Sequence, residues 1–229
     1  MKSIIFACGL SLIASSAFAS LSKDEVKRLS DAAAIVSELR HAPDRGIPEE
    51  LWRKAQCVVV IPSMKKAAFV VGGEYGSGVM SCRGHGWSSP VFMQLAKGSW
   101  GLQVGAEETD LVLLVMNRRG LEKLLEDKVS LGGDASVAAG PVGRAASAAT
   151  DAQLSAEMLA YSRSHGVFAG IDLSGGVLRP DKEADARAYG PNVTARDVVM
   201  GTAHRAPLEA AAPFLTALRE DVRATPGSK

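Results

Sequence analysis

Two lysines in this chain have the type and spacing to hold an anion. Lys65 and Lys66 follow Pro62 and Ser63, directly after a β-branched run at residues 57–61. A proline after such a run predicts a turn between two strands, and this turn would bring both ammonium groups to one edge of a sheet. Adjacent lysines can hold an anionic headgroup as point charges. The alternative is that both are solvated turn charges.

A glycine-rich segment at residues 131–144 is the second candidate for anion binding. It carries almost no large side chains, so its backbone can approach a ligand or another strand closely. Amide groups near Gly140 and Gly143 could form a concave phosphate site, and the guanidinium of Arg144 could add a bidentate contact. The alternative is that the glycines permit tight packing within a sheet.

Catalytic and metal-binding patterns are missing from the sequence. No G-x-S-x-G motif precedes a helix, and the four histidines are scattered without ligand spacing. The glycines of residues 73–78 are reversed relative to a dinucleotide-binding loop and predict a hairpin between two strands. We therefore expect no enzyme activity, no cofactor and no metal site.

Net charge argues against nucleic acid as a partner. The chain holds 26 basic and 25 acidic residues, a formal net charge of +1. A nucleic-acid-binding protein normally shows a clear basic excess or stripe.

Residues 1–19 have the features of a secretory signal peptide. Lys2 precedes an apolar run, and Ala17-Phe18-Ala19 matches the small-x-small cleavage pattern. We expect cleavage after Ala19 and a periplasmic or secreted protein, with a peripheral position on a membrane surface as an alternative to a freely diffusing one.

Export would leave two cysteines, Cys57 and Cys82, in a compartment that favours disulfides. A bridge between them would close a loop of 26 residues, worth roughly 3.5 kcal/mol by chain entropy. The alternative is two separate buried thiols.

The elements that must position these residues alternate between short strands and helices. Ser22 and Glu25 form a capping box that begins an amphipathic helix of about 18 residues, which we expect to pack on the domain. Further helices are expected at 48–55, 118–127, 182–189, 194–200 and 207–222. Strands are expected at 57–61, 67–73, 78–82, 91–95, 99–105, 110–116, 156–163 and 167–173.

This order predicts one α+β domain over residues 20–229. We expect a curled antiparallel or barrel-like sheet, flanked by helices at both ends of the chain. The domain core would cover about residues 29–189, followed by C-terminal helices at 194–222.

Several motifs resemble the SYLF domain family. They are the run CVVVIPSMKKAAFVVGGEYG from residue 57, GWSSP from residue 86 and GAEETD from residue 105. LGGD from residue 131, AGPVGR from residue 139 and YSRSHGVFAG from residue 161 follow in the same order. The resemblance runs from about Leu29 to Tyr189.

The resemblance implies a non-enzymatic binding module. Eukaryotic members are associated with phosphoinositide-containing membranes and, in fungi, with actin filaments. For an exported protein, the expectation is therefore a lipid-binding domain that contacts anionic phospholipid or phosphoinositide-type headgroups through Lys65, Lys66 and Arg144. The alternative is a structural envelope factor with a protein partner, for which an actin-type filament is the family's example.

Overall fold

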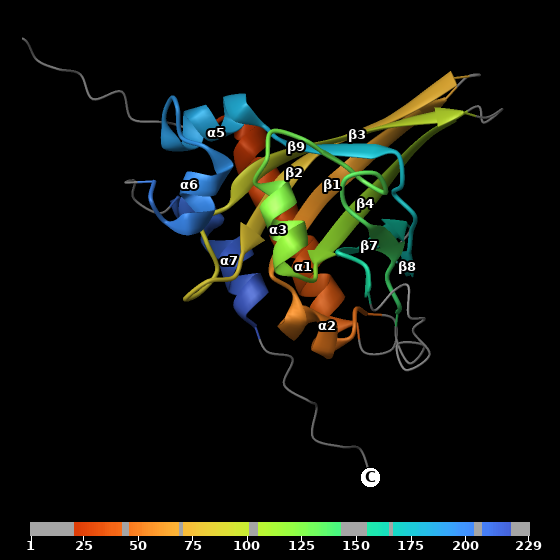
Figure 1. Ribbon diagram of the computed structural model, residues 1–229, viewed down its shortest axis with the longest axis horizontal. Helices are drawn as coiled ribbons and strands as arrows, with labels where there is room; N and C mark the ends of the chain where they lie inside the picture. Colours follow the sequence, from red (N-terminus) through yellow and green to blue (C-terminus); the bar gives the residue numbers. More distant parts are fainter. Residues whose placement is uncertain are drawn as a thin grey trace, which may run out of the picture.

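A computed structural model describes residues 21–42, 46–68, 71–100, 105–142, 155–164, 167–203 and 208–220. These residues form an α+β fold in which a strongly curled sheet carries helices from both ends of the chain (Figure 1). The predicted fold class is confirmed. Within the described residues the strand order is β5-β9-β3-β2-β1-β4-β7-β6, and β8 also pairs with β7.

Four long strands form the centre of this sheet. They are β1 (Cys57–Ala68), β2 (Val71–Cys82), β3 (Val91–Trp100) and β4 (Gly105–Val115). The shorter strands are β5 (Val129–Ser130), β6 (Val137–Ala139), β7 (Met158–Ser164), β8 (Val167–Gly170) and β9 (Gly176–Pro180). Because β6 runs parallel to β7, the sheet is mixed rather than wholly antiparallel.

The apolar run that begins β1 lies at the middle of the sheet. Residues 57–61 are fully buried and pair with β2 on one side and β4 on the other. A strand covered on both faces reads as a continuous apolar run rather than an alternating one. The expected disulfide is present, because Cys57 and Cys82 lie directly opposite each other in the β1–β2 ladder and are bonded.

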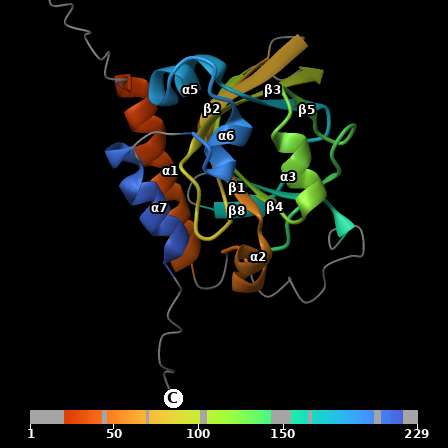
Figure 2. The same ribbon diagram turned by 60° about the vertical axis from the view of Figure 1, so that its left-hand side comes forward.

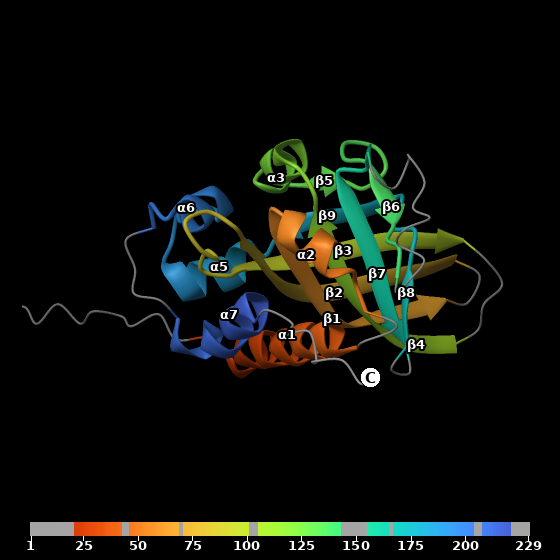
Figure 3. The ribbon, with the colours of Figure 1, turned by 90° about the horizontal axis from the view of Figure 1, so that it is seen from below.

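Helices from the two ends of the chain form one layer against the sheet. These are α1 (Lys23–His41) and α7 (Ala212–Arg219), which lie side by side in Figures 2 and 3. Leu29, Val36 and Leu39 of α1 are buried, and α1 contacts both α7 and strands β1 and β2. The amphipathic N-terminal helix is therefore packed on the fold, as expected.

The remaining helices surround the sheet. They are α2 (Glu49–Lys54), α3 (Arg118–Leu124), α5 (Lys182–Tyr189), α6 (Ala195–Met200) and the 3-10 turn η2 (Glu209–Ala211). The single helix expected over residues 207–222 is instead η2 followed by the shorter α7.

The hairpin expected at residues 73–78 is wrong, because these residues lie inside β2. None of their glycines has a positive φ, so the backbone makes no turn there. Instead, a Cβ at Gly78 would overlap the Val60 carbonyl, and one at Gly76 would overlap the Ile61 side chain. The glycines thus let β2 approach β1 closely, beside the register shift that β1 makes between Val60 and Lys65.

Other strand boundaries also differ from the prediction. Of the strand expected at residues 99–105, the first two residues end β3 and Gly105 begins β4, while residues 101–104 lie outside the described residues. Gly175 makes a turn with φ 82°, and the β9 strand that follows it and pairs with β3 was not expected. The signal-peptide prediction for residues 1–19 lies outside the described residues.

Candidate anion-binding groove

A groove of about 320 Å³ lies where the first turns of α1 cross β1 and β2. The helix contributes Lys27 and Arg28 together with the carboxylates of Asp24 and Asp31. Strand β1 contributes Ser63 and Lys65. Tyr75 completes one wall from β2. The capping box fixes the start of α1: the Ser22 side chain accepts the Glu25 N–H, and the Glu25 carboxylate accepts the Ser22 N–H at 2.7 Å.

The structure separates the two lysines that the sequence placed together. Both lie in β1 rather than in a turn, so the predicted turn is wrong. Consecutive strand residues point to opposite faces of a sheet, and only Lys65 lines the groove. Lys66 is on the other face, where its Nζ lies 3.6 Å from the Glu74 carboxylate.

The local backbone explains why the turn prediction failed. Ser63 has φ 45°, and both ladders of β1 change register between residues 60 and 65. The Ser63 N–H donates to the side-chain carboxylate of Asp110 on β4 at 2.9 Å instead of to a backbone carbonyl. Pro62 therefore lies at a bulge within one long strand.

The three cations of the groove differ in their ion pairing. Lys27 pairs with Asp31 at 2.5 Å, and Arg28 pairs with Asp181 at 2.8 Å. Among the described residues, Lys65 forms no ion pair. Its ammonium is therefore the groove cation with the least to lose on meeting an external anion.

An exposed aromatic side chain stands beside this free ammonium. Tyr75 is the direct cross-strand neighbour of Lys65 and is 50% exposed, which is high for a large side chain. The Ser77 hydroxyl donates to the Tyr75 phenol oxygen at 3.3 Å. A phenol next to an ammonium combines an apolar body with polar ends, as at membrane–water interfaces.

The glycine-rich candidate occupies a different part of the fold. Gly140 is buried after β6, and its N–H already donates to the Ala160 carbonyl at 3.0 Å. A Cβ at this position would overlap the ring of Tyr161, which is fully buried. Close packing explains Gly140, while Gly143 and Arg144 lie outside the described residues. The anion-binding role of this segment remains a prediction.

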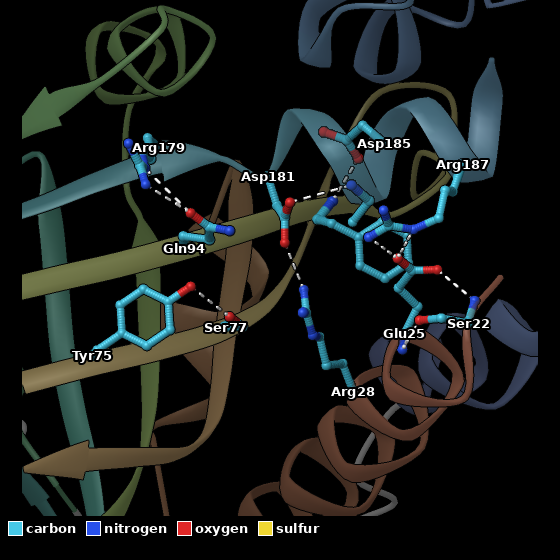
Figure 4. A network of polar contacts seen from close by, with 12 residues as sticks. Ser22, Glu25, Arg28, Tyr75, Ser77, Gln94, Arg179, Asp181, Asp185 and Arg187 are labelled. Carbon is cyan, nitrogen blue, oxygen red and sulfur yellow. Dashed lines mark hydrogen bonds and ion pairs between the residues drawn. The ribbon is translucent and has the colours of Figure 1, made fainter. Parts of the chain in front are cut away.

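Behind the groove lies a network of carboxylates and guanidiniums that the sequence did not reveal (Figure 4). Glu25 is fully buried and accepts a hydrogen bond from Arg187 at 2.7 Å. Asp181 accepts from Arg28, and its other oxygen accepts the Ala184 N–H at 3.2 Å. Burial acts to raise the pKa of Asp181, but these hydrogen bonds outweigh it and hold the pKa below its usual value.

Asp185 is the third carboxylate of this network and has a different environment. It is 2% exposed, and one oxygen accepts the Phe92 N–H at 2.9 Å. Burial raises its pKa to about 7, and the negative charges of Asp181 and Glu25 act in the same direction. Asp181 caps α5 and Asp185 lies one turn later, a spacing that in sequence indicates only the start of a helix.

Two further observations apply to the described part of the chain. No described cluster of histidine, cysteine, aspartate or glutamate side chains could hold a metal ion. Within the same residues, no helix is long and apolar enough to cross a membrane.

A comparison with known protein families identifies the relatives of this fold. A family profile described as "Ysc84: Las17-binding protein actin regulator" matches residues 96–221, which is more than half of the 229 residues. The chain belongs to the Ysc84 family. This agrees with the resemblance to the SYLF domain seen in the sequence motifs.

Full-length relatives extend the similarity toward the N-terminus. Yeast LAS seventeen-binding protein 3 is 36% identical over 163 residues, covering 69% of this chain and 35% of its own length. Yeast protein YSC84 is 34% identical, and the match covers 76% of this chain and 38% of the yeast protein. Human SH3 domain-containing YSC84-like protein 1 is 32% identical, and the match covers 80% of this chain and 55% of the human protein. This Ysc84-family chain thus spans about a third to a half of the length of these relatives, the first of which is named for binding LAS seventeen.

Proposed function

We propose that this Ysc84-family chain is a binding module that attaches to anionic lipid headgroups through the groove between α1 and strands β1 and β2. The observation that carries the proposal is the pairing of Lys65 with Tyr75 at the mouth of that groove. Lys65 has no ion-pair partner among the described residues, and the neighbouring phenol is half exposed. A phosphate oxygen could accept from the ammonium while the ring contacts the headgroup region.

The expected attraction is short-ranged and weak. A lysine near an anionic bilayer contributes about 1 kcal/mol, and the formal net charge of +1 adds little long-range steering. Two of the three groove cations are already paired with Asp31 and Asp181. Binding should therefore depend on the local site and fall as salt screens it, since the Debye length is about 8 Å at physiological ionic strength.

Co-sedimentation of the protein with vesicles tests this function. Vesicles of phosphatidylcholine alone would be compared with vesicles that also contain phosphatidylglycerol, cardiolipin or a phosphoinositide. The expected result is binding to the anionic vesicles at low salt, with less at physiological salt and none to phosphatidylcholine. Equal binding to neutral and anionic vesicles, or no binding to either, would contradict the proposal.

A protein partner is the second candidate function. It is favoured by the family's description as Las17-binding actin regulators and by the names of the yeast relatives. The matched profile begins at residue 96, so the groove residues on α1, β1 and β2 lie outside it. Co-sedimentation with filamentous actin distinguishes this candidate: saturable binding that salt and vesicles leave unchanged favours a protein-binding role.

We also propose that residues 1–19 direct export and are removed. Mass spectrometry of the protein from periplasmic and cytoplasmic fractions would detect a mature form that begins at Ser20. An intact Met1 in all fractions would contradict export.

A further inference from the structure

A second cavity, of about 500 Å³, lies beside α5 and shares no lining residue with the groove. Its walls come from the residues after α3, from α5 and from the segment that begins α6. Pro180, Ala186 and Val193 give it apolar surface. This volume is within the range of small-ligand pockets, about 300–1,000 Å³.

The buried carboxylate of Asp185 lines this cavity. One oxygen is held by the Phe92 N–H, and the other has no hydrogen-bond partner among the described residues. In Figure 4 this second oxygen points away from the Arg28–Asp181 pair. A carboxylate taken out of water normally needs an opposite charge, and Asp185 presents one oxygen without it.

The network as a whole is short of one positive charge. Glu25 is neutralised by Arg187, and Asp181 is neutralised by Arg28. Asp185 has neither guanidinium as a partner, and Tyr189 of the same helix faces it as a neutral phenol. Three carboxylates therefore share two cations.

The charged groups around the cavity do not supply the missing cation. After α3, Glu126 and Asp127 add two carboxylates. Lys182 of α5 lies 2.8 Å from Asp127 and is mostly exposed, and Arg196 of α6 is also exposed. With Asp185 ionised, these five groups sum to a charge of −1.

We propose that this cavity binds a compact organic cation, a primary ammonium group, on the free oxygen of Asp185. The carboxylate supplies the charge, and the apolar wall accommodates a short alkyl chain. The ammonium could belong to a free amine or to a lysine side chain of a protein partner, because the recognising chemistry is the same. The site does not overlap the groove and does not depend on lipid binding.

Binding at this site should be coupled to the ionisation of Asp185. Burial and the neighbouring carboxylates favour the neutral acid, and a bound ammonium favours the carboxylate. With a pKa of about 7, the ionised fraction is about 30-fold larger at pH 8 than at pH 5.5. The affinity for an ammonium ligand should follow that fraction.

Butylammonium and butyrate, which differ in charge but little in size, are suitable probes. Amide chemical shifts of the full chain would be followed during each titration at pH 8 and pH 5.5, at constant ionic strength. We expect butylammonium to shift the amides of Ala186 and Val193, with about 30-fold weaker affinity at pH 5.5. Tighter binding of butyrate, or no shifts with either probe, would overturn the proposal.

Two variants locate the contact. Asp185→Asn should remove butylammonium binding at both pH values, whereas Asp31→Asn should retain it, because Asp31 pairs with Lys27 on α1 and does not line the cavity. Undiminished binding by Asp185→Asn would refute the assignment. If Asp185→Asn does not fold, the unmodified protein provides the test through a pH titration of its carboxyl ¹³C signals. Bound butylammonium should lower the pKa of Asp185, and an unchanged pKa would refute the site.

A short peptide, acetyl-Gly-Lys-Gly-amide, distinguishes the two sources of the ammonium. Binding of both butylammonium and the peptide supports entry of a partner's lysine. Binding of butylammonium alone supports a free amine.

Discussion

Asp185→Asn should make the stability of the protein less sensitive to pH. Between pH 5 and pH 8, the free energy of unfolding should fall less in this variant than in the unmodified chain. The carboxyl is 2% exposed, and its pKa of about 7 lies above the ordinary value of 3.8. The folded state therefore binds the proton more tightly than the unfolded state does. The proton on Asp185 therefore stabilises the folded state fully below about pH 3.8, and this stabilisation is lost as the pH rises through about 7. Asparagine keeps an oxygen for the Phe92 N–H and has no proton to lose.

The size of the effect follows from the two pKa values. Between pH 5 and pH 8, ionisation of Asp185 costs the folded state about 2.5 kcal/mol. The pKa of Asp181 is held below its usual value, so this neighbour is ionised over the whole range in both proteins, and titrating groups distant from the network affect both proteins alike. The difference between the two proteins therefore isolates Asp185.

Urea denaturation at pH 5, 6, 7 and 8, monitored by circular dichroism, measures this difference. The free energy of unfolding of the unmodified protein should fall by about 2.5 kcal/mol more than that of Asp185→Asn over this range. Parallel pH profiles would refute the reasoning, because they would mean that Asp185 titrates alike in the folded and unfolded states.

Two other predictions concern stability. Replacing Cys57 and Cys82 together by alanine should lower the free energy of unfolding by about 3.5 kcal/mol, since the bridge closes a long loop of the unfolded chain; a urea midpoint equal to that of the unmodified protein would contradict this. Gly140→Ala should cost about 3 kcal/mol, because the new methyl group meets the buried Tyr161 ring. Gly98→Ala in β3 is the matched control, since a Cβ there meets nothing within 4 Å. Equal thermal stability of the two alanine variants would show that Gly140 is not a packing residue.

The sequence predicted those parts of the fold whose local residue pattern has a single physical interpretation. The capping box of Ser22 and Glu25 begins α1, and the buried run after Cys57 forms the centre of β1. The disulfide followed from two cysteines and an expected oxidising compartment, and the register confirms it because the two residues are opposite each other.

Glycine and proline were misinterpreted because each has two physical uses. Gly76 and Gly78 suit a turn or a close approach between strands, and only the position of Ile61 shows that the second applies. Likewise Pro62 suits a turn or a bulge, and the ladders of β2 and β4 continue past it. Such choices depend on residues distant in sequence.

The candidate site was predicted only in part. Lys65 was singled out from the sequence and does line a groove, but the helix residues Lys27 and Arg28 that share it were not predicted as site residues. Asp185 was not considered at all. An aspartate one turn inside a helix looks unremarkable until β3 and α1 bury it beside two other carboxylates.

The most direct test of the proposed function compares three single-charge variants for binding to phosphatidylglycerol vesicles at low salt. Lys65→Gln removes the groove ammonium, Lys66→Gln removes the lysine of the opposite face, and Lys54→Gln removes an exposed lysine of α2. All three variants lose the same charge, and they differ in the position of the lysine and in the ion pairs that Lys66 and Lys54 form with glutamates. We predict about fivefold weaker binding for Lys65→Gln, from about 1 kcal/mol of lost attraction, and little change for the other two. Equal loss in all three variants, or none in Lys65→Gln, would contradict binding through the groove.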